Sequence, residues 1–399
     1  MKYDFTTVTD RMGKDATCVD ALGRPGVPGL PKEGFSAIPM WVADMNFPCA
    51  PCIVESMERR LSHPLFGYFA PSDEFYHAII DWLNVRHGVK GLSKECIGYE
   101  NGVLGGLVTA AGILCSKGDK ILVHSPTYIG FTKSLQNNGY QLIHSPLYQD
   151  DQMIWRMDYE DMEQKIVNEN IHCAVFCSPH NPTGRVWERG ELERAMALFQ
   201  KHDVYVIADE IWADIVTTGY THITTQSVST DARQRTIALY APSKTFSLAG
   251  LVGSYHIIFN KRLRDRAEKE ASLSHYNSMN VLSMHALIGA YSGKGQEWAS
   301  QLCEVLTENI RVACDYFEKI DGITFSKPQG TYMLFIDCTK WCKNHQKTLD
   351  DLLKSGWDVG VAWQDGRPFH GSCHIRINLA LPKQLLEEAL SRLDQYVFE

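Results

Sequence analysis

The sequence predicts an α/β protein with two domains: a large domain built on a mostly parallel sheet covered by helices, and a smaller α+β domain. Two patterns carry this prediction. From about Ile97 onward, short apolar segments alternate with helix-like segments, which is typical of a parallel sheet with helices on both faces. After about Tyr291 the alternation gives way to a long helix, strand pairs and further helices. The 399 residues are enough for two domains.

Apolar residues at helical spacing predict the helices of the large domain. In the segment 73–86, for example, Phe75, Ile79, Ile80 and Leu83 recur on one face. The predicted helices cover residues 52–60, 73–86, 102–115, 127–137, 162–168, 188–201 and 260–270. The predicted strands cover residues 120–124, 141–144, 173–177, 204–208, 236–240 and 255–259.

The remaining segments predict the small domain. The expected elements are a helix over 297–319, strands over 324–326 and 332–337, a helix over 349–355, a strand over 374–379 and a helix from Pro382. The first 50 residues are rich in Gly and Pro and predict an extended arm. We therefore expect a large domain over residues 51–290 and a small domain made of residues 1–50 and 291–399.

Composition argues against several classes of function. A net charge of −8 and a pI near 6.0 give no attraction to nucleic acid or to an anionic membrane. The N-terminus has no apolar signal segment, and the apolar run 102–115 is too short to span a bilayer, so we expect a soluble cytoplasmic protein. The twelve cysteines are then expected to be reduced, and the isolated Cys49–Cys52 pair predicts neither zinc nor redox chemistry.

The segment 236–253 (TIALYAPSKTFSLAGLVG) holds the first candidate residues. It opens as a buried strand that Pro242 ends, and Ser243 and Lys244 follow directly. A lysine held on a rigid strand end and partly desolvated becomes a nucleophile suited to a Schiff base. On its own, however, Lys244 is better interpreted as an ordinary surface lysine.

Further polar groups follow the neighbouring strands. In open parallel sheets, ligands bind at the edge formed by the carboxyl ends of the strands. The polar groups are Tyr128 after the strand 120–124, His180 and Asn181 after 173–177, and Asp209 and Glu210 after 204–208. Upstream, Asn101 and Gly102 precede a helix whose free backbone N–H groups can receive a phosphate. Each residue alone also fits an ordinary helix start, a turn or the core.

Together these groups match the needs of one cofactor, pyridoxal 5′-phosphate. A lysine forms its Schiff base, and a carboxylate keeps its ring nitrogen protonated so that the ring acts as an electron sink. An amide can donate to the ring hydroxylate, and an aromatic side chain can stack on the ring. Because the groups occur in the right order on successive strand ends, the joint interpretation is preferred over the separate ones.

The motifs SPHNPTG, ADEIW and APSKTFSLAG resemble those of the fold-type I pyridoxal-phosphate enzymes of the aspartate aminotransferase superfamily. The resemblance covers nearly the whole chain. It implies Lys244 as the Schiff-base lysine and proton shuttle, and Asp209 as the partner of the ring nitrogen. It also implies five other cofactor contacts: Asn181 at the ring oxygen O3′, Tyr128 stacked on the ring, and, at the phosphate, the hydroxyl of Ser243 with the N–H groups of Gly102 and Val103.

Two further residues match the superfamily outside these motifs. Arg376, in HIRINLA, matches the arginine that binds the α-carboxylate of the substrate, a bidentate contact that lysine makes poorly. Tyr68, in GYFAPS, matches a tyrosine that reaches the phosphate in the neighbouring subunit. The resemblance thus implies a homodimer with shared active sites.

Two departures bear on the reaction. Val252 stands where many aminotransferases have a phosphate-binding arginine, and Trp212 where many have a tyrosine that bonds O3′. By contrast, WVADMNF, GYFAPS, CSPHNPTGRVW and APSKTFSLAGL together resemble the cystathionine β-lyase branch, typified by cystalysin and the MalY/PatB-type C–S lyases. That branch commonly has histidine at the position of Trp212, and cystalysin has a second tyrosine at the position of Ile129.

The resemblance therefore implies a lyase that cleaves cystathionine or a related cysteine S-conjugate to a thiol, pyruvate and ammonia, with Lys244 and Tyr128 moving the protons. Two alternatives remain open: an aminotransferase, which shares the cofactor residues, and a non-catalytic binding or regulatory protein that keeps the fold. His275, Tyr276 and Asn277 are interpreted as ordinary loop residues.

Overall fold

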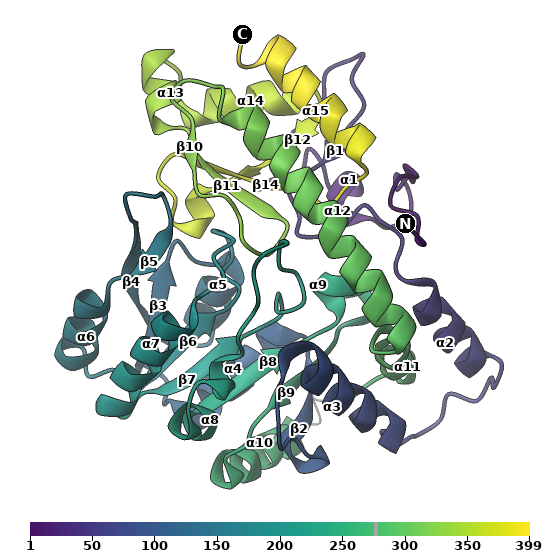
Figure 1. Cartoon of the computed structure of the whole chain (residues 1–399), viewed down its shortest axis with the longest axis vertical. Coiled ribbons are helices and arrows are strands. Elements are labelled where there is room, and N and C mark those ends of the chain that lie inside the picture. The colour runs from purple at the N-terminus through teal and green to yellow at the C-terminus, as the bar shows by residue number, and fades with distance from the viewer. Residues whose placement is uncertain (275–277) are drawn as a thin grey trace.

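A computed structural model describes residues 1–274 and 278–399; His275, Tyr276 and Asn277, interpreted from the sequence as loop residues, lie outside this part of the chain. Its largest element is an eight-stranded sheet that crosses the lower half of the molecule in Figure 1. In spatial order its strands are β2 (Ile97–Asn101), β9 (Gly253–Ile257), β8 (Thr236–Tyr240), β7 (Tyr205–Asp209), β6 (Cys173–Cys177), β3 (Lys120–Ser125), β4 (Gln141–Gln149) and β5 (Trp155–Met157).

The sheet is mostly parallel, as the sequence predicts. The neighbours β8, β7, β6, β3 and β4 are parallel, whereas β9 runs antiparallel to both of its neighbours and β5 antiparallel to β4. The strand predicted at 255–259 is thus present but reversed. Its direction follows from the short connection 241–252, which contains one turn of helix, α9 (Ser243–Phe246), and no helix long enough to cross back over the sheet.

Alternate side chains of the central strands enter two different cores. In β6, Cys173 and Val175 pack with one core, while Ala174 and Phe176 pack with the other. Because successive side chains of a strand point to opposite faces, the sheet is buried on both sides. The first core is covered by α4 (Val103–Leu114), α5 (Ile129–Asn137) and α10 (Lys261–Ser274), and the second by α3 (Asp73–His87), α6 (Tyr159–Asn168), α7 (Arg189–Lys201), α8 (Thr230–Arg235) and α11 (Val281–Ala290).

A smaller antiparallel sheet forms the upper part of the molecule (Figure 1). Its strand order is β10 (Thr324–Phe325), β11 (Met333–Asp337), β14 (His374–Asn378) and β13 (Gln364–Asp365). It packs with α13 (Thr339–Asn344), α14 (Leu349–Asp358), α15 (Lys383–Tyr396) and the end of α12 (Gly293–Phe317) around a core of its own. The α+β character predicted for this part is therefore confirmed.

The N-terminal segment joins the smaller sheet region through β1 (Ile38–Pro39), which pairs in parallel with β12 (Val361–Ala362). The helix α12 belongs to both cores, since Trp298 near its start packs with the large sheet and Phe317 at its end with the small one. The domain limits 51–290 and 1–50 with 291–399 stay a prediction. Among the described residues, no helix is both long and apolar enough to cross a membrane.

Several elements were missing from the sequence prediction, among them β2, β5 and α11. The strand β5 has only three residues, and α11 has buried residues on nearly every side, so no amphipathic period marks it. The α11 helix packs closely on α2 (Pro51–Leu61): a Cβ at Gly289 would lie 2.6 Å from the carbonyl oxygen of Cys52.

Candidate active site

The carboxyl ends of β6, β7 and β8 and the start of α4 surround a cavity of about 220 Å³. Among the residues that line it are seven singled out from the sequence: Gly102, Val103, Tyr128, Asn181, Asp209, Ser243 and Lys244. They come from five separate segments, and the parallel strands bring them together because their ends meet at one edge. The other polar residues of these strand ends, His180 and Glu210, do not line the cavity and bond elsewhere.

The start of α4 offers backbone donors to this cavity. Gly102 caps the helix with φ +78°, a conformation that favours glycine. The first intrahelical hydrogen bond runs from the N–H of Gly106 to the carbonyl of Gly102, so the N–H groups of Val103, Leu104 and Gly105 have no acceptor within the helix. The N–H of Gly102 itself donates to the carbonyl of Glu100 at 3.0 Å. The donors that remain for an anion are thus those of residues 103–105, of which the sequence singled out only Val103.

Asp209 ends β7 and is buried at the cavity. Its Oδ1 accepts the backbone N–H of Ile211 at 3.0 Å. Burial raises the pKa of this carboxyl to about 7, although the Ile211 N–H and the charge of Lys244 act in the opposite direction. A buried carboxylate in this state favours a cationic or N–H partner inside the cavity.

Lys244 lies on α9 with its amine directed at the turn that precedes α2, where Nζ donates to the carbonyl of Ala43 at 2.8 Å. Burial, followed by the charge of Arg376, lowers the pKa of the amine to about 8, while Asp44 and Asp209 raise it. About a tenth of this amine is therefore uncharged at pH 7, far more than at the ordinary pKa of 10.5, and the uncharged form is the one that nucleophilic or base chemistry requires.

Arg376 reaches the site from β14 and is buried, and no carboxylate of the described residues forms an ion pair with it. Its three hydrogen bonds within the described chain go to neutral oxygens: Asn181 Oδ1 at 3.0 Å, Trp41 O at 3.2 Å and Gln364 Oε1. The Nε atom is buried with no partner among the described residues. Burial lowers the pKa of the guanidinium to about 10, so the site favours an added anion.

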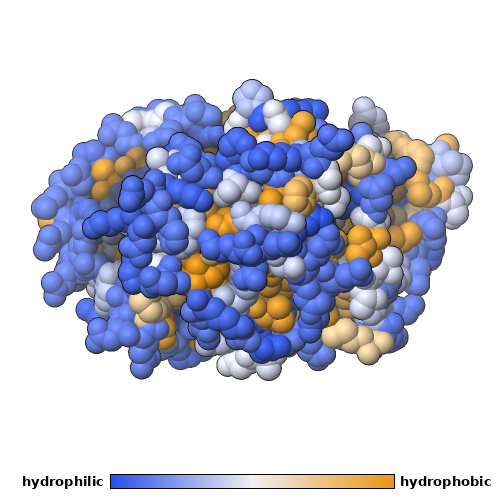
Figure 2. Space-filling model, turned by 90° about the horizontal axis from the view of Figure 1, so that it is seen from above, coloured by the Kyte–Doolittle hydropathy of each residue, from blue (hydrophilic) through white to orange (hydrophobic). Residues whose placement is uncertain are grey.

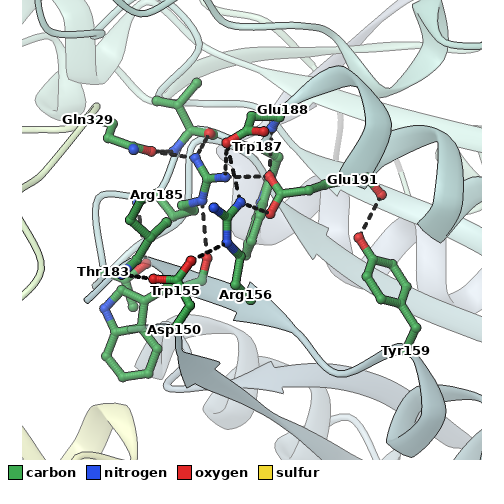
Figure 3. Close-up of polar contacts among 12 residues, drawn as sticks. Asp150, Trp155, Arg156, Tyr159, Thr183, Arg185, Trp187, Glu188, Glu191 and Gln329 are labelled. Carbon is green, nitrogen blue, oxygen red and sulfur yellow. Dashed lines mark hydrogen bonds and ion pairs between the residues drawn. The ribbon is translucent and has the colours of Figure 1, made fainter. Parts of the chain in front are cut away.

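The loop that carries Asn181 is held by a buried polar cluster (Figure 3). At its centre Arg185, whose side chain is 2% exposed, donates to the carbonyl of Trp155 at 3.1 Å, to Gln329 and to the carboxylate of Glu191. Arg156 of β5 also binds Glu191, at 2.9 Å, from a more exposed position. These contacts hold the segment that follows Asn181, and Asn181 itself lines the cavity.

Two departures noted in the sequence also lie at the cavity. The ring of Trp212 is buried, and its centroid is 5.7 Å from Nζ of Lys244. Val252 has φ +55°, an uncommon conformation for a β-branched residue, and the residue is a little under half exposed. Sequence reasoning missed Ala43 and Cys177 as lining residues; Cys177 is the last residue of β6, which was the available signal, whereas Ala43 arrives from a distant segment.

Tyr68 does not lie with the other candidates. It is fully exposed in the segment between α2 and α3, and Leu65, Phe66 and Phe69 beside it are exposed in part. In the view from above, hydrophobic surface gathers at the right-hand edge, the side on which α2 and this segment lie (Figures 1 and 2). An exposed apolar patch of this kind is typical of an interaction surface.

Known proteins are similar to this chain over most of its length. The model of the family "Aminotransferase class I and II" matches residues 39–393. The chain is 32% identical to cystathionine beta-lyase PatB of Bacillus subtilis, covering 90% of this chain and 92% of PatB. It is 30% identical to the protein MalY of Escherichia coli over 98% of both chains.

Among solved structures, the PLP-bound C–S lyase of Staphylococcus hominis superposes with a TM-score of 0.89 at 29% identity, covering 100% of this chain and 99% of the lyase. The resemblance inferred from the motifs is thereby confirmed. The chain belongs to the class I and II aminotransferase family and has its pyridoxal-phosphate fold type I.

Proposed function

We propose that this protein is a pyridoxal-phosphate-dependent carbon–sulfur β-lyase that cleaves cystathionine or a related cysteine S-conjugate to a thiol, pyruvate and ammonia. The observation that carries the proposal is the joint placement of Lys244, Asp209 and Asn181 at one cavity, with Arg376 bonded to Asn181. The likeness to PatB and to the Staphylococcus hominis lyase supports the lyase reaction over others of the family.

The residues present fit the cofactor. The buried carboxylate of Asp209 suits a protonated ring nitrogen, and such a partner would bring its pKa back down. The free N–H groups at the start of α4 and the hydroxyl of Ser243 suit a phosphate. Asn181 accepts from Arg376 with its oxygen, which leaves its NH₂ to donate to the ring hydroxylate.

When bound, pyridoxal phosphate supplies an electron-accepting ring that weakens the Cα–H bond of an attached amino acid. The chain's own groups then orient the substrate and move protons. Arg376 binds the α-carboxylate with the donors that its neutral partners leave free. The uncharged amine of Lys244 takes the Cα proton at Nζ.

Tyr128 is placed to serve the leaving sulfur. Burial raises the pKa of its hydroxyl, so it stays protonated at neutral pH and can act as a proton donor. Lys244, once it carries the Cα proton, is the second donor available to the thiolate. The indole of Trp212 offers no comparable proton, so these two residues are the proposed acid–base pair.

We further propose a homodimer in which Tyr68 of one subunit completes the phosphate site of the other. The exposure of Tyr68 and of the apolar residues beside it supports this assignment. The cytoplasmic location expected from the sequence stays a prediction.

The proposal is tested with purified protein loaded with pyridoxal phosphate. We expect a visible absorbance band of lysine-linked cofactor, and pyruvate and thiol release from L-cystathionine without any added keto acid. Lys244→Ala should lose both the band and the activity, while Lys354→Ala, which changes an exposed lysine of α14, should keep both.

An aminotransferase would give a different result. It would produce no pyruvate from cystathionine alone and would turn over an amino acid only when a keto acid is supplied. An unchanged band in Lys244→Ala would overturn the assignment of the lysine itself.

A further inference from the structure

The turn Trp41–Asp44 presents its carbonyl oxygens to the working residues of the site. The carbonyl of Trp41 accepts Nη2 of Arg376 at 3.2 Å, and that of Ala43 accepts Nζ of Lys244 at 2.8 Å. Between and after them, the carbonyls of Val42 and Asp44 both accept Nδ2 of Asn378, at 2.7 and 2.8 Å. One short turn therefore holds both the amine and the guanidinium of the site.

The carboxylate of Asp44 fastens this turn to two other segments. Its Oδ2 is 2.6 Å from Nη2 of Arg11, and its Oδ1 accepts the hydroxyl of Ser247 at 3.2 Å. Arg11 also donates to the carbonyl of Met45 and to Oδ1 of Asn46, so it connects the N-terminal arm to the turn and to the two residues that follow it. Ser247 lies three residues after the lysine, at the end of α9.

We propose that Asp44 is a positioning residue of the active site: tied to Arg11 and Ser247, it fixes the turn that orients Lys244 and Arg376 and places a negative charge near the lysine. The inference rests on the proposed function, since it assumes that the cofactor is linked to Lys244. It adds Asp44 and Arg11, which come from segments far from the strand ends, to the residues that govern the site.

The charges around Lys244 make the proposal testable by titration. The charged groups that act on the amine are Asp209 from β7, Arg376 from β14 and Asp44 from the turn. Asp44 and Asp209 favour the protonated form of the nitrogen and Arg376 disfavours it. Arg11 forms an ion pair with Asp44 and so offsets part of its negative charge. Removing Asp44 therefore makes the electrostatic potential at Lys244 more positive, and removing Arg11 makes it more negative.

The experiment compares Asp44→Asn and Arg11→Gln with the wild-type holoenzyme. In each, the pH midpoint of the absorbance change of the lysine-linked cofactor is measured, together with kcat and KM for L-cystathionine. Asp44→Asn should lower the pH midpoint by about half a pH unit or more. Arg11→Gln, which leaves the carboxylate of Asp44 without its ion-pair partner, should raise the midpoint by about the same amount. Both should raise KM several-fold, about tenfold at most, because the turn that holds Arg376 is loosened.

A matched control is Asp358→Asn, which removes two ion pairs away from the cavity: Lys32 of the N-terminal arm to Asp358 at 3.0 Å, and Lys354 of α14 to Asp358 at 2.6 Å. It should leave both the midpoint and KM unchanged. Midpoints that stay at the wild-type value, or that move in the same direction in both variants, would overturn the proposal. A loosened turn alone gives no reason for the two midpoints to move in opposite directions, whereas a change of charge does. A wild-type protein without the cofactor band would instead overturn the proposed function, and this inference with it.

Discussion

Nη1 of Arg376 lies 3.0 Å from Oδ1 of Asn181, so a residue of the small sheet is hydrogen-bonded to a residue of the large domain that lines the cavity. The two residues are 195 positions apart in the chain. This hydrogen bond fixes the position of Arg376, proposed to bind the substrate carboxylate, relative to Asn181, proposed to bind the cofactor. Changes at either residue should therefore affect substrate and cofactor together.

Replacing Arg376 by lysine should lower kcat/KM for L-cystathionine about 100-fold, because a single ammonium cannot make the bidentate contact of a guanidinium. The loss should shrink for an analogue that lacks the α-carboxylate. Steady-state kinetics on both compounds measures the difference. The same exchange at Arg367, an exposed arginine paired with Asp350 and Asp365, is the control and should change neither value. Equal losses on both compounds would argue against the carboxylate role.

Replacing Asp209 by asparagine should stabilise the cofactor-free protein above neutral pH. The folded-state pKa of about 7 lies above the usual value of 3.8, so the unfolded chain loses its proton first as the pH rises. The free energy of unfolding of the wild type therefore decreases as the pH rises from 3.8 to 7 and does not recover above pH 7. The total loss is about 1.4 kcal/mol for each unit by which the folded-state pKa exceeds the unfolded-state pKa. Asparagine has no proton to lose, and its advantage should grow from pH 5 to pH 8 in thermal unfolding.

Glu210 provides the contrasting control for this experiment. Burial alone would raise its pKa, but its contacts with His222, Thr225 and Tyr240 bring it below the usual range. Glu210→Gln should therefore destabilise the protein at pH 8, where Asp209→Asn stabilises it. With cofactor bound, Asp209→Asn should instead lose about a thousandfold in kcat, because the partner of the ring nitrogen is gone. A cofactor-free Asp209→Asn protein less stable than wild type at pH 8 would contradict this account.

Much of the large sheet and its edge could be predicted because local patterns specify them. The strands Cys173–Cys177 and Thr236–Tyr240 begin and end where the apolar runs do, and the residues after them meet at the cavity. The direction of β9 was not predictable in this way, since it depends on how the connection 241–252 folds. The hydrogen bond from the N–H of Gly102 to the carbonyl of Glu100 was not predictable either, because it depends on the local backbone geometry.

The contacts of the Trp41–Asp44 turn were beyond sequence reasoning for a different reason. Lys244 is 201 positions from Ala43, and Arg376 is 335 from Trp41, so neither contact leaves a local pattern. The segment was visible as a motif, but its backbone carbonyls carry the contacts and any residue supplies those. Two residues of the turn also bond through their side chains: Asp44 binds Arg11 and Ser247, and the indole N–H of Trp41 donates to the carbonyl of Cys18.

Mixing two inactive variants should restore activity if Tyr68 serves the neighbouring subunit. Lys244→Ala removes the lysine from one chain and Tyr68→Ala the tyrosine from the other, so each mixed dimer has one site with both residues intact. After co-refolding at equal amounts, we expect about a quarter of wild-type activity per site. The measurement is pyruvate release before and after mixing. No recovery from a mixture that forms dimers would place Tyr68 outside the shared site.

Replacing Arg185 by alanine should destabilise the protein by about 3–5 kcal/mol, because it leaves the buried ends of Glu191 and Gln329 short of a partner. The loop from His180 to Arg185, closed by the Gly184 N–H to His180 O bond at 2.7 Å, should lose its support, so cofactor affinity should fall with stability. Chemical denaturation and cofactor titration measure the two effects.

Arg156→Ala is the matched control for this last change, because Arg156 binds the same Glu191 from a side chain that is 25% exposed rather than 2%. An ion pair at that exposure contributes about 1 kcal/mol or less. The control should therefore lose little stability and keep the wild-type affinity for the cofactor, since Arg185 still holds the loop. Equal losses in both variants would mean that the charge balance of Glu191, and not the buried position of Arg185, supports Asn181.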